Sequence, residues 1–159
     1  MDEDDNVIGK ASRKEVRVGA LRHRIVKIIV IDKKDRYLIQ KRSQKKDNFP
    51  SHWDLGCAET VASGETYDEA ALRGLKEELG MEIPKSELCL QFSFKYDSPI
   101  HNANYNVYKV LYDNKLNLQK DEIDEIRFLK KEDIFGLIKE GTFHPAAALI
   151  FKKYCGNNF

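Results

Sequence analysis

The segment from Thr66 to Gly80 most constrains the fold, because the sequence marks both ends of a helix there. Thr66 is followed three residues later by Glu69, the pattern of a capping box, in which each side chain accepts a hydrogen bond from the other residue's backbone. Gly80 can adopt the left-handed conformation that commonly ends a helix. Between these ends, apolar residues recur at helical spacing, at Ala70, Leu72, Leu75 and Leu79. The sequence therefore predicts an amphipathic helix that buries one face.

Short apolar runs on both sides of this helix indicate strands. The run RIVKIIVI, residues 24–31, is rich in β-branched side chains, as is typical of a buried strand. The run LCLQFSFKY, residues 88–96, alternates apolar and polar side chains, as a half-buried strand does. Further strands are expected at 36–42, 104–112 and 126–130, and further helices at 131–141 and 144–155. Helices interspersed among strands predict an α/β or α+β fold with a mixed sheet between helices.

Length and composition restrict the kind of protein. The 159 residues suit a single domain, 1–159, in which residues 1–18 form an N-terminal extension. A net charge of +1 does not favour a nucleic-acid or membrane surface, and no apolar run approaches the roughly 20 residues of a membrane helix. Three widely spaced cysteines and an acidic N-terminus suggest neither a disulfide framework nor a secretory signal. We therefore expect a cytoplasmic protein with a small-molecule partner, and neither a nucleic acid nor a membrane.

Two adjacent carboxylates, Glu77 and Glu78, lie near the C-terminal end of the predicted helix. That end of the helix dipole is negative, so two carboxylates there are unfavourable unless a cation neutralises them. Carboxylate oxygens are typical ligands of hard divalent ions such as Mg²⁺ and Mn²⁺. Arg73, one helical turn before Glu77, could orient a carboxylate through a bidentate contact. The alternative is a solvated acidic helix end with ordinary ion pairs.

The segment from Glu59 to Met81 resembles the Nudix box, whose pattern is G-x5-E-x7-R-E-U-x-E-E-x-G-U, with U a bulky aliphatic residue. The matching positions are Glu65, Arg73, Leu75, Glu77, Glu78, Gly80 and Met81. Two positions depart from the pattern: Glu59 replaces the first glycine, and Gly74 replaces the glutamate after the arginine. The resemblance implies a Nudix-type α/β/α sandwich, and an Mg²⁺- or Mn²⁺-dependent hydrolase of a nucleoside diphosphate linked to a group X or of a similar diphosphate.

The resemblance also implies roles for individual residues. Glu77 and Glu78 would be metal ligands, and the backbone carbonyl of Ala58 a further one. Glu65 and Arg73 would form a supporting pair, with Glu65 beside the metal and Arg73 beside the substrate. Many relatives dimerise, so the resemblance leaves a homodimer open.

The region from His23 to Trp53 resembles the corresponding part of isopentenyl-diphosphate isomerase, a Nudix-fold enzyme, and of bacterial Nudix proteins close to it. This second resemblance implies that Arg42 and Lys46 bind the substrate diphosphate and that His23 binds metal. Pro50 and Trp53 also fall in step, and we assign Trp53 to the substrate site. For His23, Arg42 and Lys46 the alternative is an ordinary strand end.

Isomerisation is the least expected activity of this chain. The catalytic cysteine of the isomerase corresponds to Ala58, and a metal-binding histidine corresponds to Thr60. Cys57 is displaced by one position and would point to the opposite face of a strand.

The missing glutamate at Gly74 leaves three interpretations open. The base that activates water could lie elsewhere, with Glu122 or Glu125 as candidates, or Glu78 could take that role. Glu59 could occupy the space that Gly74 vacates and so compensate for the loss. Alternatively, the site could have decayed into a weak or inactive binder of a phosphorylated metabolite.

Overall fold

The computed structural model describes residues 1–45, 48–112, 116 and 123–156, so Lys46 and Glu122 lie outside the described residues. The helices are α1 (Arg13–Val18), α2 (Tyr67–Leu79), the 3₁₀ helix η1 (Lys85–Glu87), α3 (Lys131–Lys139) and α4 (Pro145–Tyr154). The strands are β1 (His23–Ile31), β2 (Tyr37–Arg42), β3 (Trp53–Leu55), β4 (Cys57–Thr60), β5 (Cys89–Tyr96), β6 (Ala103–Leu111) and β7 (Ile123–Leu129).

The sheet is mixed, as the sequence predicts. Its main path runs β3-β2-β1-β6-β5, with β4 paired to β1 and β7 paired to β2. Strands β1 and β6 are parallel along their whole length, and the other named pairs are antiparallel. Strand β1 therefore lies at the centre, with β6 on one side and β4 and β2 on the other.

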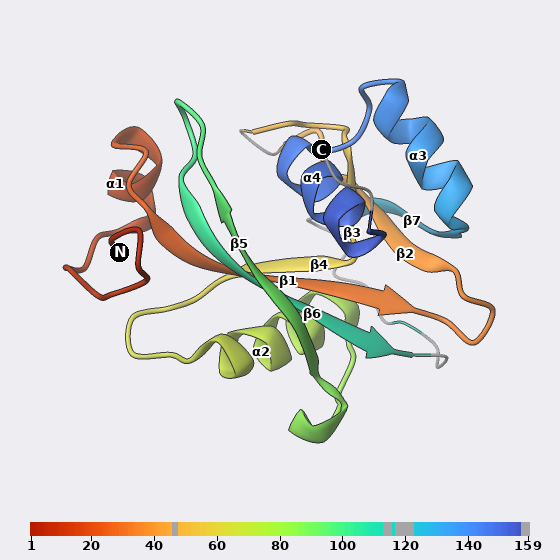
Figure 1. Ribbon diagram of the computed structural model, residues 1–159, viewed down its shortest axis with the longest axis horizontal. Coiled ribbons are helices and arrows are strands. Elements are labelled where there is room, and N and C mark those ends of the chain that lie inside the picture. The colour runs from red at the N-terminus through yellow and green to blue at the C-terminus, as the bar shows by residue number, and fades with distance from the viewer. Residues whose placement is uncertain (46–47, 113–115, 117–122, 157–159) are drawn as a thin grey trace.

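Helices cover both faces of this sheet, and β1 contributes side chains to the core on each face. Ile25 and Ile29 belong to the cluster under α3 and α4, whereas Val26 and Ile28 belong to the cluster under α2. Successive side chains of a strand point to opposite faces, so one apolar strand can fill two layers. Figure 1 shows α2 on one side of the sheet and α3 with α4 on the other. The predicted α/β/α sandwich is confirmed.

Gly56 lets β4 cross close to β1. Its φ is +54°, and a Cβ atom there would lie 1.8 Å from the carbonyl oxygen of Ile28, so glycine is required. The chain then enters β4, whose Ala58 pairs with Lys27 and whose Glu59 pairs with Val26. This close crossing brings the start of the Nudix-box-like segment against the central strand.

Helix α2 forms as predicted. Thr66 and Glu69 make both hydrogen bonds of the capping box, and Gly80 ends the helix with a φ of 65°. One detail differs: Ala71 is buried and Leu72 only partly so, because the buried face turns toward β4. The buried face also includes Gly74 and Glu78.

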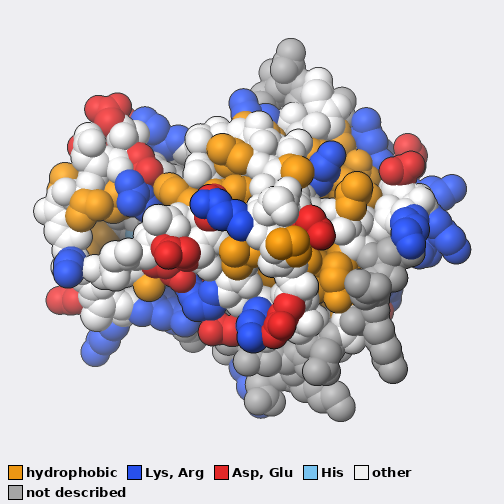
Figure 2. Space-filling view, turned by 90° about the horizontal axis from the view of Figure 1, so that it is seen from below, with side chains coloured by type: hydrophobic (Ala, Val, Ile, Leu, Met, Phe, Trp, Pro, Cys, Tyr) orange, Lys and Arg blue, Asp and Glu red, His pale blue; other side chains and the backbone are white. Residues whose placement is uncertain are grey.

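Several elements differ from the sequence prediction. Helix α1 and strands β3 and β4 were not predicted, and β7 begins at Ile123 rather than at 126. The strands β3 and β4 have three and four residues, too few for a periodic pattern. In the part of the chain that the structure describes, no helix is long and apolar enough to cross a membrane. On the face that Figure 2 shows, charged side chains of both signs are interspersed with hydrophobic ones.

Candidate active site

A polar cavity of about 370 Å³ lies between β4, α2 and the end of β2. The predicted site residues that line it are Arg42, Ala58, Glu59, Arg73, Glu77 and Glu78. Strand β4 supplies Ala58 and Glu59, and the last two turns of α2 supply Arg73, Glu77 and Glu78. The structure thus gathers most of the predicted metal and phosphate residues around one space.

Glu78 is a buried carboxylate with a neutral neighbour. Its side chain is only 9% exposed, and the amide Nε2 of Gln40 lies 3.3 Å from its Oε2. Burial raises the pKa of Glu78 to about 7, and the nearby charge of Glu59 adds to this. Among the described side chains, the Oε1 of Gln40 is a buried oxygen without a hydrogen-bond partner. A buried carboxylate beside an unpartnered amide oxygen favours a bound cation.

Glu59 occupies the space beside Gly74. A Cβ atom at position 74 would lie 2.9 Å from the Cβ and 3.4 Å from the Cγ of Glu59, and 3.4 Å from the Sγ of Cys57. Two Cβ atoms do not approach so closely, so Glu59 in this position requires glycine at 74. The side chain of Glu59 is not directed out to solvent: it lies in the cavity that Glu78 also lines. The two departures from the box are therefore in direct contact.

Arg73 connects the acidic residues around the cavity. Its Nε and Nη2 donate to the two carboxylate oxygens of Glu65 at 2.8 and 2.9 Å, a bidentate pair. Its Nη1 lies 3.3 Å from Glu59 Oε2 and 3.4 Å from Glu77 Oε2. The hydrogen bonds from Arg73 lower the pKa of Glu65. The predicted Arg73–Glu65 pair therefore also contacts the carboxylates that line the cavity.

A buried ion pair holds Arg42 at the polar cavity. Lys27 and Asp54 are both nearly inaccessible and form a salt bridge, and Arg42 Nη1 lies 3.4 Å from Asp54 Oδ2. Burial alone would raise the pKa of Asp54, but Lys27, His144 and Arg42 outweigh it and hold the pKa well below its usual range. Arg42 also donates to the carbonyl of Phe49. Its guanidinium is thus fixed at the cavity from several sides.

No sequence motif marks Lys27, Gln40 or Asp54 as site residues. A usable signal existed for Lys27, because a lysine inside an otherwise apolar strand requires a buried acidic partner. Asp54 and Gln40 carry no comparable signal, since their places depend on the pairing of β2 with β3.

A second, larger cavity of about 1050 Å³ adjoins the polar cavity. His23 lines this larger cavity, with its Nδ1 2.9 Å from the carbonyl of Leu21 and its ring 5.2 Å from that of His101. Burial lowers the pKa of His23, so its ring is mainly neutral at pH 7. His23 is not among the residues that line the polar cavity with Glu77 and Glu78.

Trp53 and Glu125 also lie away from the polar cavity. Trp53 is 7% exposed and belongs to the core under α4. The Arg127 guanidinium lies over its ring, 4.7 Å from the ring centroid. Glu125, on β7, pairs with Arg127 at 2.6 Å. Neither residue lines either of the two cavities.

The chemistry of the donor set fits a hard divalent ion. Glu59, Glu77, Glu78 and Ala58 line the polar cavity, and oxygen ligands suit Mg²⁺ or Mn²⁺. Within the described ranges, no three histidine, cysteine or acidic side chains are grouped closely enough to hold a metal as they stand.

Comparison with known proteins decides the family, because residues 21–153 match the NUDIX domain. The chain belongs to the Nudix family. It is 35% identical over 123 residues to an uncharacterized Nudix hydrolase of Listeria innocua, a match covering 77% of this chain and 72% of that protein. It is 33% identical over 154 residues to the uncharacterized Nudix hydrolase YfcD of Escherichia coli, covering 94% and 82% of the two chains.

A solved structure supports the same Nudix fold. The crystal structure of DR0079 from Deinococcus radiodurans superposes with a TM-score of 0.81 at 28% sequence identity, covering 96% of this chain and 94% of that one. That superposition includes most of the N-terminal extension as well as the domain.

Proposed function

We propose that this Nudix protein is an Mg²⁺- or Mn²⁺-dependent diphosphohydrolase of a nucleoside diphosphate linked to a group X or of a similar organic diphosphate. The observation that carries the proposal is that Glu59, Glu77 and Glu78 line one polar cavity although position 74 has no carboxylate. The substrate is a small molecule, and we place the protein in the cytoplasm, in keeping with its three free cysteines. The suggestion that the protein forms a homodimer rests on the family resemblance alone.

The metal would be held by Glu77, Glu78 and the backbone carbonyl of Ala58, with Glu65 supporting through Arg73. When bound, the ion would neutralise phosphate oxygens and lower the pKa of a water molecule. Arg42 would bind a phosphate group, for which a guanidinium fork is well shaped. Lys46, Trp53 and His23 remain predicted contacts, of which Trp53 and His23 lie outside the polar cavity.

Glu59 is our first candidate for the function lost at Gly74. Its carboxylate reaches the cavity from β4, directly over the glycine that replaces the box glutamate. In this role Glu59 would accept a proton from water or complete the metal site, with Glu78 as the second candidate base. Glu122 and Glu125 remain predictions, and Glu125 is paired with Arg127.

The alternative is a catalytically weak or inactive Nudix protein that binds a phosphorylated metabolite. The observation in its favour is that Arg73 contacts both Glu59 and Glu77, which occupies carboxylates that catalysis needs. Isomerisation receives no support from the geometry. Ala58 occupies the expected cysteine position, and Cys57 is fully buried with a pKa raised well above its usual value by burial.

Product release from a panel of nucleoside and prenyl diphosphates, with Mg²⁺ or Mn²⁺ and with EDTA, tests the proposal. We expect metal-dependent release that falls by at least about 100-fold in Glu77→Gln and Glu78→Gln. Glu87→Gln, on the exposed η1, is the matched control and should leave release unchanged. Metal-dependent binding of these diphosphates without release would favour the alternative. Release that survives both substitutions would refute the metal site.

A further inference from the structure

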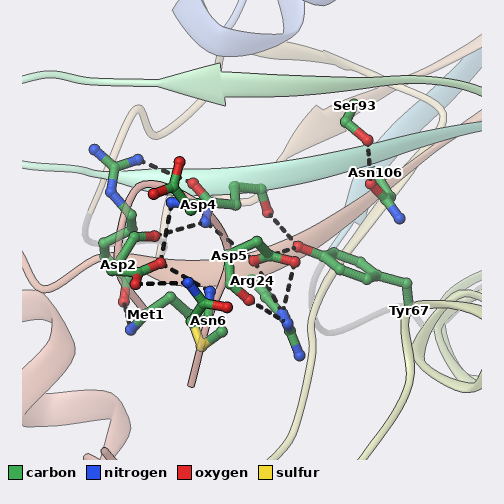
Figure 3. Close-up of polar contacts among 11 residues, drawn as sticks. Met1, Asp2, Asp4, Asp5, Asn6, Arg24, Tyr67, Ser93 and Asn106 are labelled. Carbon is green, nitrogen blue, oxygen red and sulfur yellow. Dashed lines mark hydrogen bonds and ion pairs between the residues drawn. The ribbon is translucent and has the colours of Figure 1, made fainter. Parts of the chain in front are cut away.

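The N-terminal segment, residues 1–20, is held against the sheet by partly buried polar contacts. Asn104, on β6 and only 7% exposed, donates from Nδ2 to the carbonyl of Asp2 and to Oδ1 of Asp5, both at 3.0 Å. Arg24 donates from Nε to both oxygens of Asp5 at 3.0 Å, and the Tyr67 hydroxyl donates to Oδ1 at 3.0 Å. Figure 3 shows Asp5 between Arg24 and Tyr67.

These contacts make the segment part of the folded domain. Without Asp2 and Asp5, the buried amide of Asn104 would lose two acceptors, and an unsatisfied buried donor is costly. Tyr67 is the first residue of α2, so the same cluster joins the segment to the helix that carries Glu77 and Glu78. The anchor thus sets the position of α1 relative to the candidate active site.

Helix α1 brings two arginines to the polar cavity. Arg13 and Arg17, four residues apart and on one face of the helix, line both the polar cavity and the larger cavity beside it. Val7 and Ile8, 66% and 72% exposed, line the larger cavity as well. The N-terminal segment therefore contributes two arginines to the polar cavity and apolar side chains to the larger cavity.

Two further arginines of the polar cavity have acidic partners. Arg73 is paired with Glu65, and Arg42 lies against Asp54. Within the described part of the chain, the side chain of Arg13 enters no ion pair or hydrogen bond, whereas Arg17 does have an interaction partner. A phosphate-binding cavity that also holds several carboxylates needs further positive charge, and an arginine fork supplies it in a form suited to phosphate oxygens.

We propose that Arg13 and Arg17 bind the phosphate groups of the substrate, so that the N-terminal segment forms one wall of the active site. The proposal deepens the proposed function, because it assumes that the polar cavity receives a diphosphate. Val7 and Ile8 then face the organic group of the same substrate in the larger cavity.

Binding of methylenediphosphonate, a diphosphate analogue that cannot be hydrolysed, tests this proposal by calorimetry with Mg²⁺. Arg13→Ala and Arg17→Ala should each raise the Kd about 10-fold, since each removes a charged hydrogen-bond donor. Lys14→Ala removes a positive charge from the same helix but lines neither cavity, and should change the Kd less than twofold. Arg13→Lys and Arg17→Lys should recover part of the loss. Unchanged thermal unfolding of each variant shows that the fold is intact.

The outcomes separate this proposal from the proposed function. Methylenediphosphonate binding that depends on Arg13 and Arg17, in a protein that hydrolyses no diphosphate, would support the arginine proposal and refute hydrolysis. Metal-dependent hydrolysis with unchanged binding by Arg13→Ala and Arg17→Ala would overturn the arginine proposal alone. An equal loss in Lys14→Ala, or a wild-type protein that does not bind the probe, would overturn it too.

Discussion

A Cβ atom added at Gly74 would lie 2.9 Å from the Cβ of Glu59. Strand β4 and helix α2 are therefore packed so closely that the two positions cannot both carry a side chain of this kind. A glutamate at 59 and a glycine at 74 are one arrangement that fits, and the glycine and glutamate of the Nudix box are the reverse.

Gly74→Ala should destabilise the protein although alanine favours a helix. The overlap with Glu59 costs roughly 1–3 kcal/mol, which offsets the gain of about 1 kcal/mol expected from removing a mid-helix glycine. In a Glu59→Gly background the overlap is gone, so Gly74→Ala should then stabilise by about 1 kcal/mol. Urea unfolding of the four proteins measures the coupling between the two positions. Additive effects would contradict the contact.

Glu59→Gly should reduce metal-dependent diphosphate hydrolysis by about 100-fold or more, because under the proposed function Glu59 stands in for the missing carboxylate. Adding Gly74→Glu should restore much of the lost rate, since the space left by Glu59 then accepts the new side chain. Steady-state kinetics of the two variants and of Glu87→Gln provide the comparison. Full activity in Glu59→Gly would show that the base or ligand lies elsewhere.

The buried carboxylate of Glu78 should make the metal-free protein less stable as the pH rises. Its pKa is raised from 4.5 to about 7 by burial, so between these values the folded state holds a proton that the unfolded state releases. The stabilisation is fully present below pH 4.5 and is lost by pH 7, a change of about 3 kcal/mol.

Unfolding free energies of wild type and Glu78→Gln in EDTA, at pH 5 and pH 8, measure this effect. Wild type should lose stability relative to Glu78→Gln as the pH rises, and Mg²⁺ should return part of the loss at pH 8. A constant difference between the two proteins across this range would mean that Glu78 has an ordinary pKa.

Lys27→Met should cost about 3 kcal/mol of stability, because it leaves the buried carboxylate of Asp54 without its main partner. Arg42, at 3.4 Å, still offers partial compensation, so a value at the lower end for buried pairs is expected. The double variant Lys27→Met/Asp54→Asn carries no unpaired charge and should be more stable than Lys27→Met alone. Thermal and urea unfolding decide the order of the three proteins.

Local sequence was enough to predict those helices and strands whose end residues and apolar pattern lie within the element itself. Thr66, Glu69 and Gly80 mark the ends of α2 through side-chain and backbone preferences that act within a few residues. The apolar run of β1 likewise identifies a buried strand. The short strands β3 and β4 could not be found this way, because they exist through pairing with β2 and β1. Helix α1 buries no residue and so carries no apolar stripe.

For the site, the sequence by itself determined which residues share the helix: Arg73, Glu77 and Glu78 are linked by its periodicity, and their match to the Nudix box identified the family. Only the tertiary structure decided that Glu59 lies against Gly74, that Glu78 is buried and that several residues of the N-terminal segment line the cavities. The physical reason is that these relationships depend on strand pairing and buried hydrogen bonds between residues far apart in the chain. The spacing of residues along the sequence encodes neither the strand pairing nor these long-range hydrogen bonds.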